Sequence, residues 1–168
     1  MSAGTAVTPI QPNQALLEQR LKLQARMRGG AGWFMAVALF SVVNSALLFF
    51  NAKLHFIVGL GVTQIFDGAG KALGTAGSAV GLVVSLCASA IFLLFWKFAR
   101  EGKQWAFLTG MVLYGLDGLI FLGFGLILDF GFHIFALYCM YKGLSALNAL
   151  NQLNNQPASL ATGQTLVR

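Results

Sequence analysis

Charged side chains are scarce in this sequence. They make up 10% of its 168 residues, whereas a soluble domain carries about 25%. Hydrophobic residues make up 57% of the chain, and they gather in runs close to the roughly 20 residues that a helix needs to cross the hydrocarbon core of a bilayer. This composition excludes a soluble globular domain and indicates an integral membrane protein.

Motifs of catalysis and cofactor binding are missing as well. The two cysteines, Cys87 and Cys139, lie inside apolar runs without the spacing of a redox or metal site, so we expect them to pack as small apolar residues. There is no GxSxG turn, and the glycine-rich stretches lack the spacing of phosphate-binding loops. We therefore expect no cofactor and no catalytic residues.

The chain divides into four parts by composition. Residues 1–12 are polar and uncharged, which predicts a disordered tail and no cleavable signal peptide. Residues 13–29 predict an amphipathic cytoplasmic helix that lies on anionic lipid headgroups through Arg20, Lys22, Arg26 and Arg28. The glycine-rich stretch 29–32 predicts a flexible break, residues 30–155 form the transmembrane domain, and residues 156–168 form a flexible tail.

Four apolar segments predict an all-α, integral membrane four-helix bundle. The expected spans are residues 33–50, 77–98, 105–122 and 130–148, with Asp129 as the N-cap of the last. The last helix is expected to continue into the cytoplasm and to stop before Pro157. Residues 54–67 are apolar but too short for a span, so they predict a short outer helix that is either interfacial or re-entrant.

The distribution of basic residues predicts the orientation of this bundle. Four spans place nine lysines and arginines on one side of the membrane and only Lys53 and Lys71 on the other. Because basic residues concentrate on the cytoplasmic side, both termini are expected to be cytoplasmic. All three tryptophans, Trp33, Trp96 and Trp105, then fall at the cytoplasmic interface, where tryptophan is enriched.

Small residues recur every fourth position along the second predicted span. Gly77, Gly81, Ser85 and Ser89 form a ridge that allows another helix backbone to approach closely. The partner is either another helix of the same chain, which we favour because four short-looped helices must pack together, or a second copy of the protein.

An ionisable residue, Asp117, lies in the middle of the third predicted span. Burying a charge there costs about 2.5–3.5 kcal/mol on insertion scales. With Asn44, His133 and Tyr138 it is expected to form an intramembrane polar cluster in the outer half of the bundle. One interpretation is a structural tie made by hydrogen bonds between helices. The other is an outward-facing cavity in which an Asp117–His133 pair takes up and releases a proton or cation.

A metal site at the outer face is a further alternative. His55, Asp67, Asp129 and His133 are residue types that bind zinc, and Asp129 and His133 share a helix face at a spacing of four. The competing interpretation is that Asp129 caps a helix and that His55 and Asp67 are solvated loop residues.

Three stretches together carry a family resemblance: residues 56–67, residues 105–117, and residues 132–138 with Gly143 and Leu144 beyond. The loop at 100–107 reads Arg-Glu-Gly-Lys-Gln-Trp-Ala-Phe, an Arg-x-Gly-x-x-Trp-Ala-Phe pattern. Over residues 50–148 the chain resembles a family of small bacterial inner-membrane proteins with four transmembrane helices and no known activity. The resemblance implies a bacterial inner-membrane location and keeps Asp67, Asp117 and His133 of interest.

Three functions remain open. The first is a non-enzymatic membrane protein with an accessory or structural role. The second is a small carrier or channel for a proton, cation or solute that uses Asp117. The third is a membrane enzyme or metal site at the outer face. A dry, hydrogen-bonded Asp117 would favour the first function, a water-filled cavity reaching Asp117 the second, and a cluster of His55, His133 and a carboxylate the third.

Overall fold

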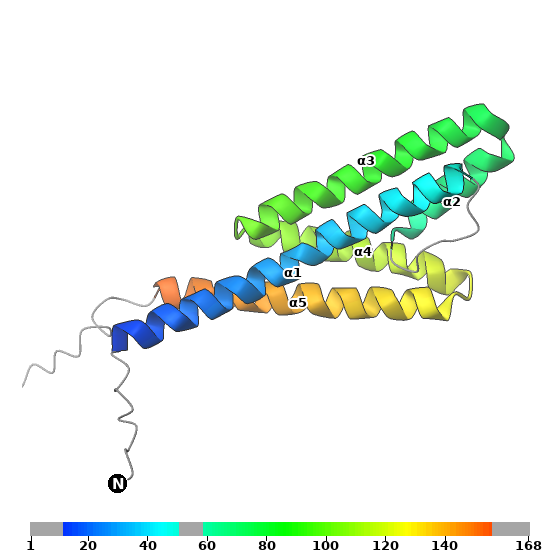
Figure 1. The fold of residues 1–168 in the computed structure, drawn as a ribbon. Coiled ribbons are helices and arrows are strands. Elements are labelled where there is room, and N and C mark those ends of the chain that lie inside the picture. The colour runs from blue at the N-terminus through cyan, green and yellow to red at the C-terminus, as the bar shows by residue number, and fades with distance from the viewer. Residues whose placement is uncertain (1–11, 51–58, 156–168) are drawn as a thin grey trace, which may run out of the picture.

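The computed structural model describes residues 12–50 and 59–155, in which every regular element is a helix (Figure 1). In chain order these are α1 (Pro12–Phe49), α2 (Gly61–Ala72), α3 (Gly74–Arg100), α4 (Gln104–Gly123) and α5 (Ile127–Asn155). Within the described residues, α1, α3 and α4 are long and apolar enough to cross a membrane. This part of the chain is therefore all-helical, as predicted, and carries three candidate spans.

The predicted fourth span, 130–148, lies inside α5 and is not one of these three candidates. Polar and charged residues, His133 and Lys142 among them, lower the apolar character of this 29-residue helix. The helix continues past residue 148 to Asn155, as predicted. Its start differs from the prediction, because Asp129 lies in the first helical turn and is not the N-cap.

The first helix is one continuous element. α1 runs unbroken for 38 residues, so the flexible break predicted at residues 29–32 is wrong. Tertiary packing overrides the low helix propensity of glycine here. Gly30 lies against Gly143 of α5, where a Cβ on Gly143 would fall 2.7 Å from the Cα of Gly30. At 1.5 Å per residue α1 is about 57 Å long, so it extends well beyond a bilayer core of about 30 Å.

The short helix α2 and the long helix α3 form a helical hairpin. α2 runs beside α3 and is linked to it through Leu73 and through Gly74, whose φ of +80° favours glycine (Figure 1). The ridge predicted on the second span packs here: a Cβ on Gly81 would lie 2.7 Å from the carbonyl oxygen of Phe66 in α2. These glycines make their close contacts within the chain, and self-association through the ridge stays a prediction.

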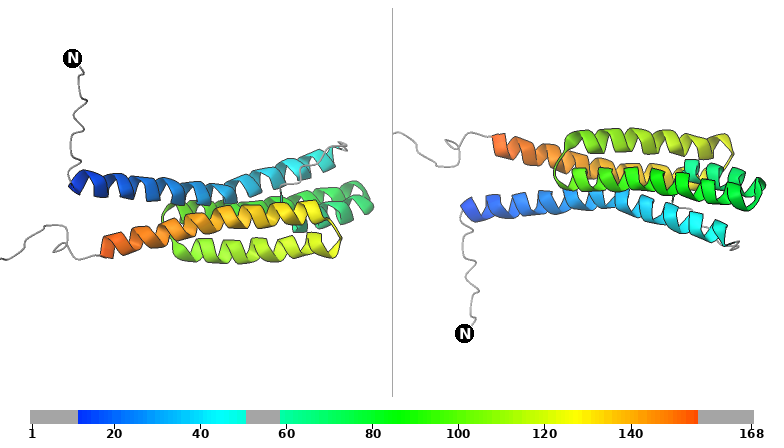
Figure 2. Two further views of the ribbon diagram at one scale, coloured as in Figure 1. Left: turned by 90° about the horizontal axis from the view of Figure 1, so that it is seen from below. Right: turned by 90° about the horizontal axis from the view of Figure 1, so that it is seen from above.

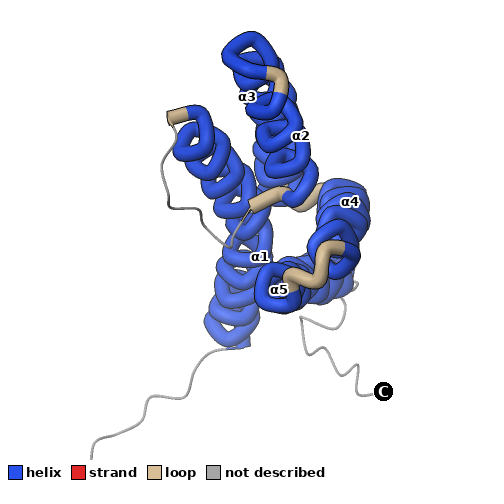
Figure 3. The backbone as a smooth tube through the Cα atoms, turned by 90° about the vertical axis from the view of Figure 1, so that its right-hand side faces the viewer, coloured by secondary structure: helices blue, strands red, loops and turns tan. Residues whose placement is uncertain are grey.

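The long helices pack side by side, with α1 against α3 and α5, and α4 against α5. Viewed end-on, α4 and α5 lie together on one side and α2 lies beside α3 on the other (Figure 3). The start of α1 and the end of α5 lie at the same end of the bundle, where both extend past the turn between α3 and α4 (Figure 2). Aromatic side chains fill the core between the long helices, with Phe34 of α1 packed against Phe92, Phe95 and Phe107.

Candidate functional site

Asp117 of α4 binds the N-terminus of α2. Its Oδ2 accepts a hydrogen bond from the backbone N–H of Gly61 at 2.7 Å, and its Oδ1 accepts one from Val62 at 2.8 Å. The first N–H groups of a helix have no partner inside that helix, and they carry the positive end of its dipole. Asp117 therefore performs from another helix the role that a capping side chain usually performs.

The sequence of α2 explains why an outside partner is needed. The N-cap position is Leu60, whose side chain makes no capping hydrogen bond. Ser41 of α1 accepts a hydrogen bond from the backbone N–H of Leu60 at 2.8 Å. Thr63 donates its hydroxyl to the carbonyl oxygen of Leu60 at 2.7 Å. The buried start of α2 thus obtains its polar partners from α1, α4 and its own first turn.

His133 of α5 completes the arrangement. Its Nε2 lies 3.1 Å from Oδ2 of Asp117, and both side chains are almost fully buried. Its Nδ1 lies 2.9 Å from the backbone carbonyl oxygen of Asp129, one turn earlier in the same helix. The carboxylate of Asp117 therefore joins α2, α4 and α5 at one point.

These contacts determine where the imidazole carries protons. A carbonyl oxygen only accepts hydrogen bonds, so Nδ1 of His133 must carry a hydrogen toward Asp129. Nε2 then faces Oδ2 of Asp117, and two acceptors at 3.1 Å would repel each other unless one proton lies between them. That proton makes the pair either an imidazolium with a carboxylate or a neutral imidazole with a carboxylic acid. The pair has no net charge in either form.

Two aromatic rings of α4 enclose the imidazole. Tyr114 stacks on His133 with ring centroids 4.3 Å apart, and the ring of Phe121 lies at 4.9 Å. Between them Gly118 provides space, since a Cβ at this position would lie 3.0 Å from the Cβ of His133. Tyr114, Asp117, Gly118 and Phe121 thus form a continuous face of α4, at the spacing expected for one side of a helix.

The four residues of the predicted polar cluster have different positions. Asp117 and His133 are in contact, and Asn44 is buried nearby on α1, beside Gly59 at the entry to α2. Tyr138 lies apart from them, because it is 57% exposed and its ring is 5.4 Å from the Nζ of Lys142. The aromatic partner of His133 is instead Tyr114, which lies one turn before Asp117.

The candidate metal ligands are also separated. Asp67 is buried on α2, where its Oδ1 accepts a hydrogen bond from the hydroxyl of Ser85 at 2.9 Å. Asp129 contributes its backbone carbonyl oxygen to His133, and His55 lies outside the described residues. In residues 12–50 and 59–155 no group of three or more His, Cys, Asp or Glu side chains could hold a metal ion.

A hollow of about 260 Å³ between α3 and α4 reaches Asp117. Every other residue that lines it is apolar: Leu60, Val62, Ala88, Ile91, Phe92, Leu113, Leu116 and Ile120. A bound water needs two to four polar partners, which this lining does not offer. The carboxylate is therefore enclosed by backbone N–H groups, an imidazole and apolar side chains.

One signal in the sequence points to this site. Leu60 occupies the N-cap position directly before α2, where a Ser, Thr, Asp or Asn is usual, although the start of the helix is buried. A buried helix start without a local cap requires acceptors from elsewhere in the fold, because unsatisfied N–H groups are costly in an apolar medium. Asp117 is the buried carboxylate that supplies them.

Over residues 12–50 and 59–155, the fold and the site together define a helical protein with three helices long and apolar enough to cross a membrane and a buried carboxylate that joins three of its helices. No protein-family model, no curated protein and no solved structure matches the chain.

Proposed function

We propose that this chain is a non-enzymatic membrane protein of the bacterial inner membrane with an accessory or structural role. In this proposal α1, α3, α4 and α5 cross the bilayer, and both termini are cytoplasmic. α2 is a re-entrant helix that begins inside the bundle, beside Asp117, and ends at the outer side. The excess of basic residues at the end that carries both termini supports this orientation.

One observation carries the structural role of Asp117. Its two carboxylate oxygens are occupied by the N–H groups of Gly61 and Val62 and by His133. A carrier would have to exchange these partners for a transported proton or cation at each cycle, and the hollow beside Asp117 offers no polar path. The dry, hydrogen-bonded carboxylate therefore favours a fixed tie between helices over a transport site.

The variant Asp117→Asn tests this role. An amide presents a donor where the carboxylate presents an acceptor, so one buried N–H loses its partner, and we expect a loss of stability on the order of 2 kcal/mol. Thermal unfolding in lipid nanodiscs would measure it. The matched control is Glu101→Gln, which removes one carboxylate from the exposed turn between α3 and α4 and is expected to change stability by at most about 0.5 kcal/mol.

The opposite result would point to transport. If Asp117→Asn is as stable as the wild type or more stable, the acid is retained at a cost in stability and not as a tie. The second function, a carrier or channel for a proton or cation, would then replace the first. Flux measurements on vesicles containing wild-type and Asp117→Asn protein would be the next step.

A further inference from the structure

A groove between α1 and α5 combines two basic side chains with aromatic ones. It has a volume of about 860 Å³. Arg26 and Trp33 line it from α1, and Tyr138, Tyr141 and Lys142 line it from α5. Among the described residues that line the groove none is acidic. The groove is therefore electropositive as well as aromatic.

Along the groove, the basic and aromatic side chains of α1 and α5 follow the same order in space. α1 and α5 run antiparallel, so Arg26 precedes Trp33 on α1 whereas Lys142 follows Tyr138 on α5. Both cations thus lie nearer than Trp33 and Tyr138 to the end of the bundle that holds the start of α1 and the end of α5, and Tyr141 lies next to Lys142 in the sequence. Arg26 and Trp33 are seven residues apart, which corresponds to about 10 Å along the helix.

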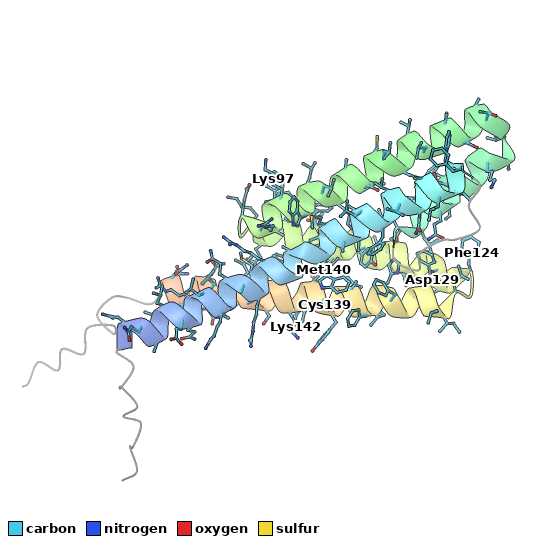
Figure 4. The ribbon with its side chains drawn as sticks, in the orientation of Figure 1. Lys97, Phe124, Asp129, Cys139, Met140 and Lys142 are labelled. Carbon is cyan, nitrogen blue, oxygen red and sulfur yellow. The ribbon has the colours of Figure 1, made fainter. Side chains whose placement is uncertain are left out.

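The floor of the groove is made by close packing of the two helices. Gly30 and Gly143 bring the backbones of α1 and α5 into contact, which holds the two basic side chains at a common cleft. Lys142 extends outward from α5 beyond Cys139 (Figure 4), and its Nζ lies 5.4 Å from the ring centroid of Tyr138. Gly29 leaves open space in the groove, since a Cβ there would meet no atom within 4 Å.

We propose that this groove binds one anionic phospholipid, with its phosphate between Arg26 and Lys142 and the upper part of its chains against Trp33 and Tyr138. The inference rests on the proposed membrane insertion. A cationic end beside an aromatic end matches the charge and polarity of such a lipid, because basic residues attract anionic headgroups and tryptophan and tyrosine favour the interface. A soluble anion would use only the cationic end.

The site differs from a diffuse attraction of the whole basic segment. Arg20 and Lys22 belong to the same helix but do not line the groove. Lys22 is largely exposed and lies 3.8 Å from Glu18. A defined site therefore predicts that Arg26 and Lys142 control lipid preference and that Arg20 and Lys22 do not, although both pairs carry the same charge.

Quenching of Trp33 fluorescence by spin-labelled lipid tests the proposal. Trp96→Phe and Trp105→Phe leave Trp33 as the single tryptophan of the full chain. The protein is placed in phosphatidylcholine vesicles that contain a small fraction of labelled phosphatidylglycerol or of labelled phosphatidylcholine. We expect the anionic lipid to reach half-maximal quenching at a mole fraction lower by roughly 25-fold, since the two nearby cations contribute roughly fivefold each.

The charge variants separate a site from a diffuse field. Arg26→Gln/Lys142→Gln is expected to bring the two labelled lipids to nearly equal quenching, whereas Arg20→Gln/Lys22→Gln retains most of the preference. Gly29→Leu keeps every charge and fills the open space in the groove, so it should also abolish the preference. Gly29→Leu therefore tests the site even where the Arg26→Gln/Lys142→Gln protein fails to fold.

Several results would overturn the proposal. Equal quenching by both lipids in the wild type, or an equal loss of preference in the Arg20→Gln/Lys22→Gln control, would show that no defined lipid site exists. Relief of quenching by millimolar inorganic phosphate would identify the occupant as a soluble anion. If neither labelled lipid quenches Trp33, the chain is not inserted and the proposed function itself fails.

Discussion

At the scale of single residues, Asp117 shows how an apolar helix can bury an ionisable group. An isolated buried charge is expensive, but here the carboxylate meets two backbone N–H groups and one imidazole. Those N–H groups would themselves be costly if left without a partner in an apolar medium. The acid and the start of α2 therefore satisfy each other, and His133 adds a third polar contact to the same carboxylate.

The space for His133 depends on a single glycine. Replacing Gly118 by alanine places a Cβ 3.0 Å from the Cβ of His133, so the His133 side chain, packed between two rings, must give way by a few tenths of an ångström. We expect Gly118→Ala to lower the stability by about 1–3 kcal/mol. Gly115→Ala is the matched control on the same helix, because its Cβ would lie at an ordinary 3.7 Å from Leu137. Unfolding in nanodiscs measures both variants.

The control is expected to gain stability. Alanine favours a helix over glycine by up to about 1 kcal/mol, and nothing near Gly115 opposes that gain. Equal effects of the two substitutions would contradict the close packing of His133 between Tyr114 and Phe121.

At the scale of helices, hydropathy predicted the existence of the elements better than their ends or contacts. The apolar runs locate α3 and α4 to within a few residues of the predicted spans. They did not predict that α1 continues through Gly29 and Gly30, because its helical state there depends on contact with α5. They also did not predict the start of α2 at Gly61, which depends on an acceptor 56 residues away in the sequence.

The crossing of α1 and α5 depends on Gly30. A Cβ at this position would lie 2.8 Å from the backbone nitrogen of Gly143, and backbone atoms cannot move aside as a flexible side chain can. Gly30→Ala should therefore separate the two helices and destabilise the protein by about 1–3 kcal/mol. Gly32→Ala on the same helix meets no atom within 4 Å and should be neutral or stabilising. Thermal unfolding compares them, and a destabilised Gly32→Ala would indicate a general intolerance of α1 to substitution.

At the scale of the whole molecule, the two ends of the bundle differ in the helices and turns that they contain. α1 and α5 pack against each other and extend beyond the α3–α4 turn, whereas the α2–α3 and α4–α5 turns lie at the opposite end (Figure 1). Lys97, Arg100 and Lys103 lie at or next to the α3–α4 turn, on the side of the chain ends. These basic residues therefore lie at the end of the bundle that is cytoplasmic in the proposed orientation.

Labelling of single cysteines decides whether α5 crosses. In a protein with Cys87→Ala and Cys139→Ala, Leu73→Cys marks the α2–α3 turn, Glu101→Cys marks the α3–α4 turn, and Gln152→Cys marks the exposed end of α5. With four spans, a membrane-impermeant maleimide added to intact cells should label only Leu73→Cys. Glu101→Cys and Gln152→Cys should become labelled after permeabilisation, because the positive-inside distribution places both in the cytoplasm. If Gln152→Cys reacts in intact cells while Glu101→Cys stays protected, only α1, α3 and α4 cross the membrane, and α5 lies outside it.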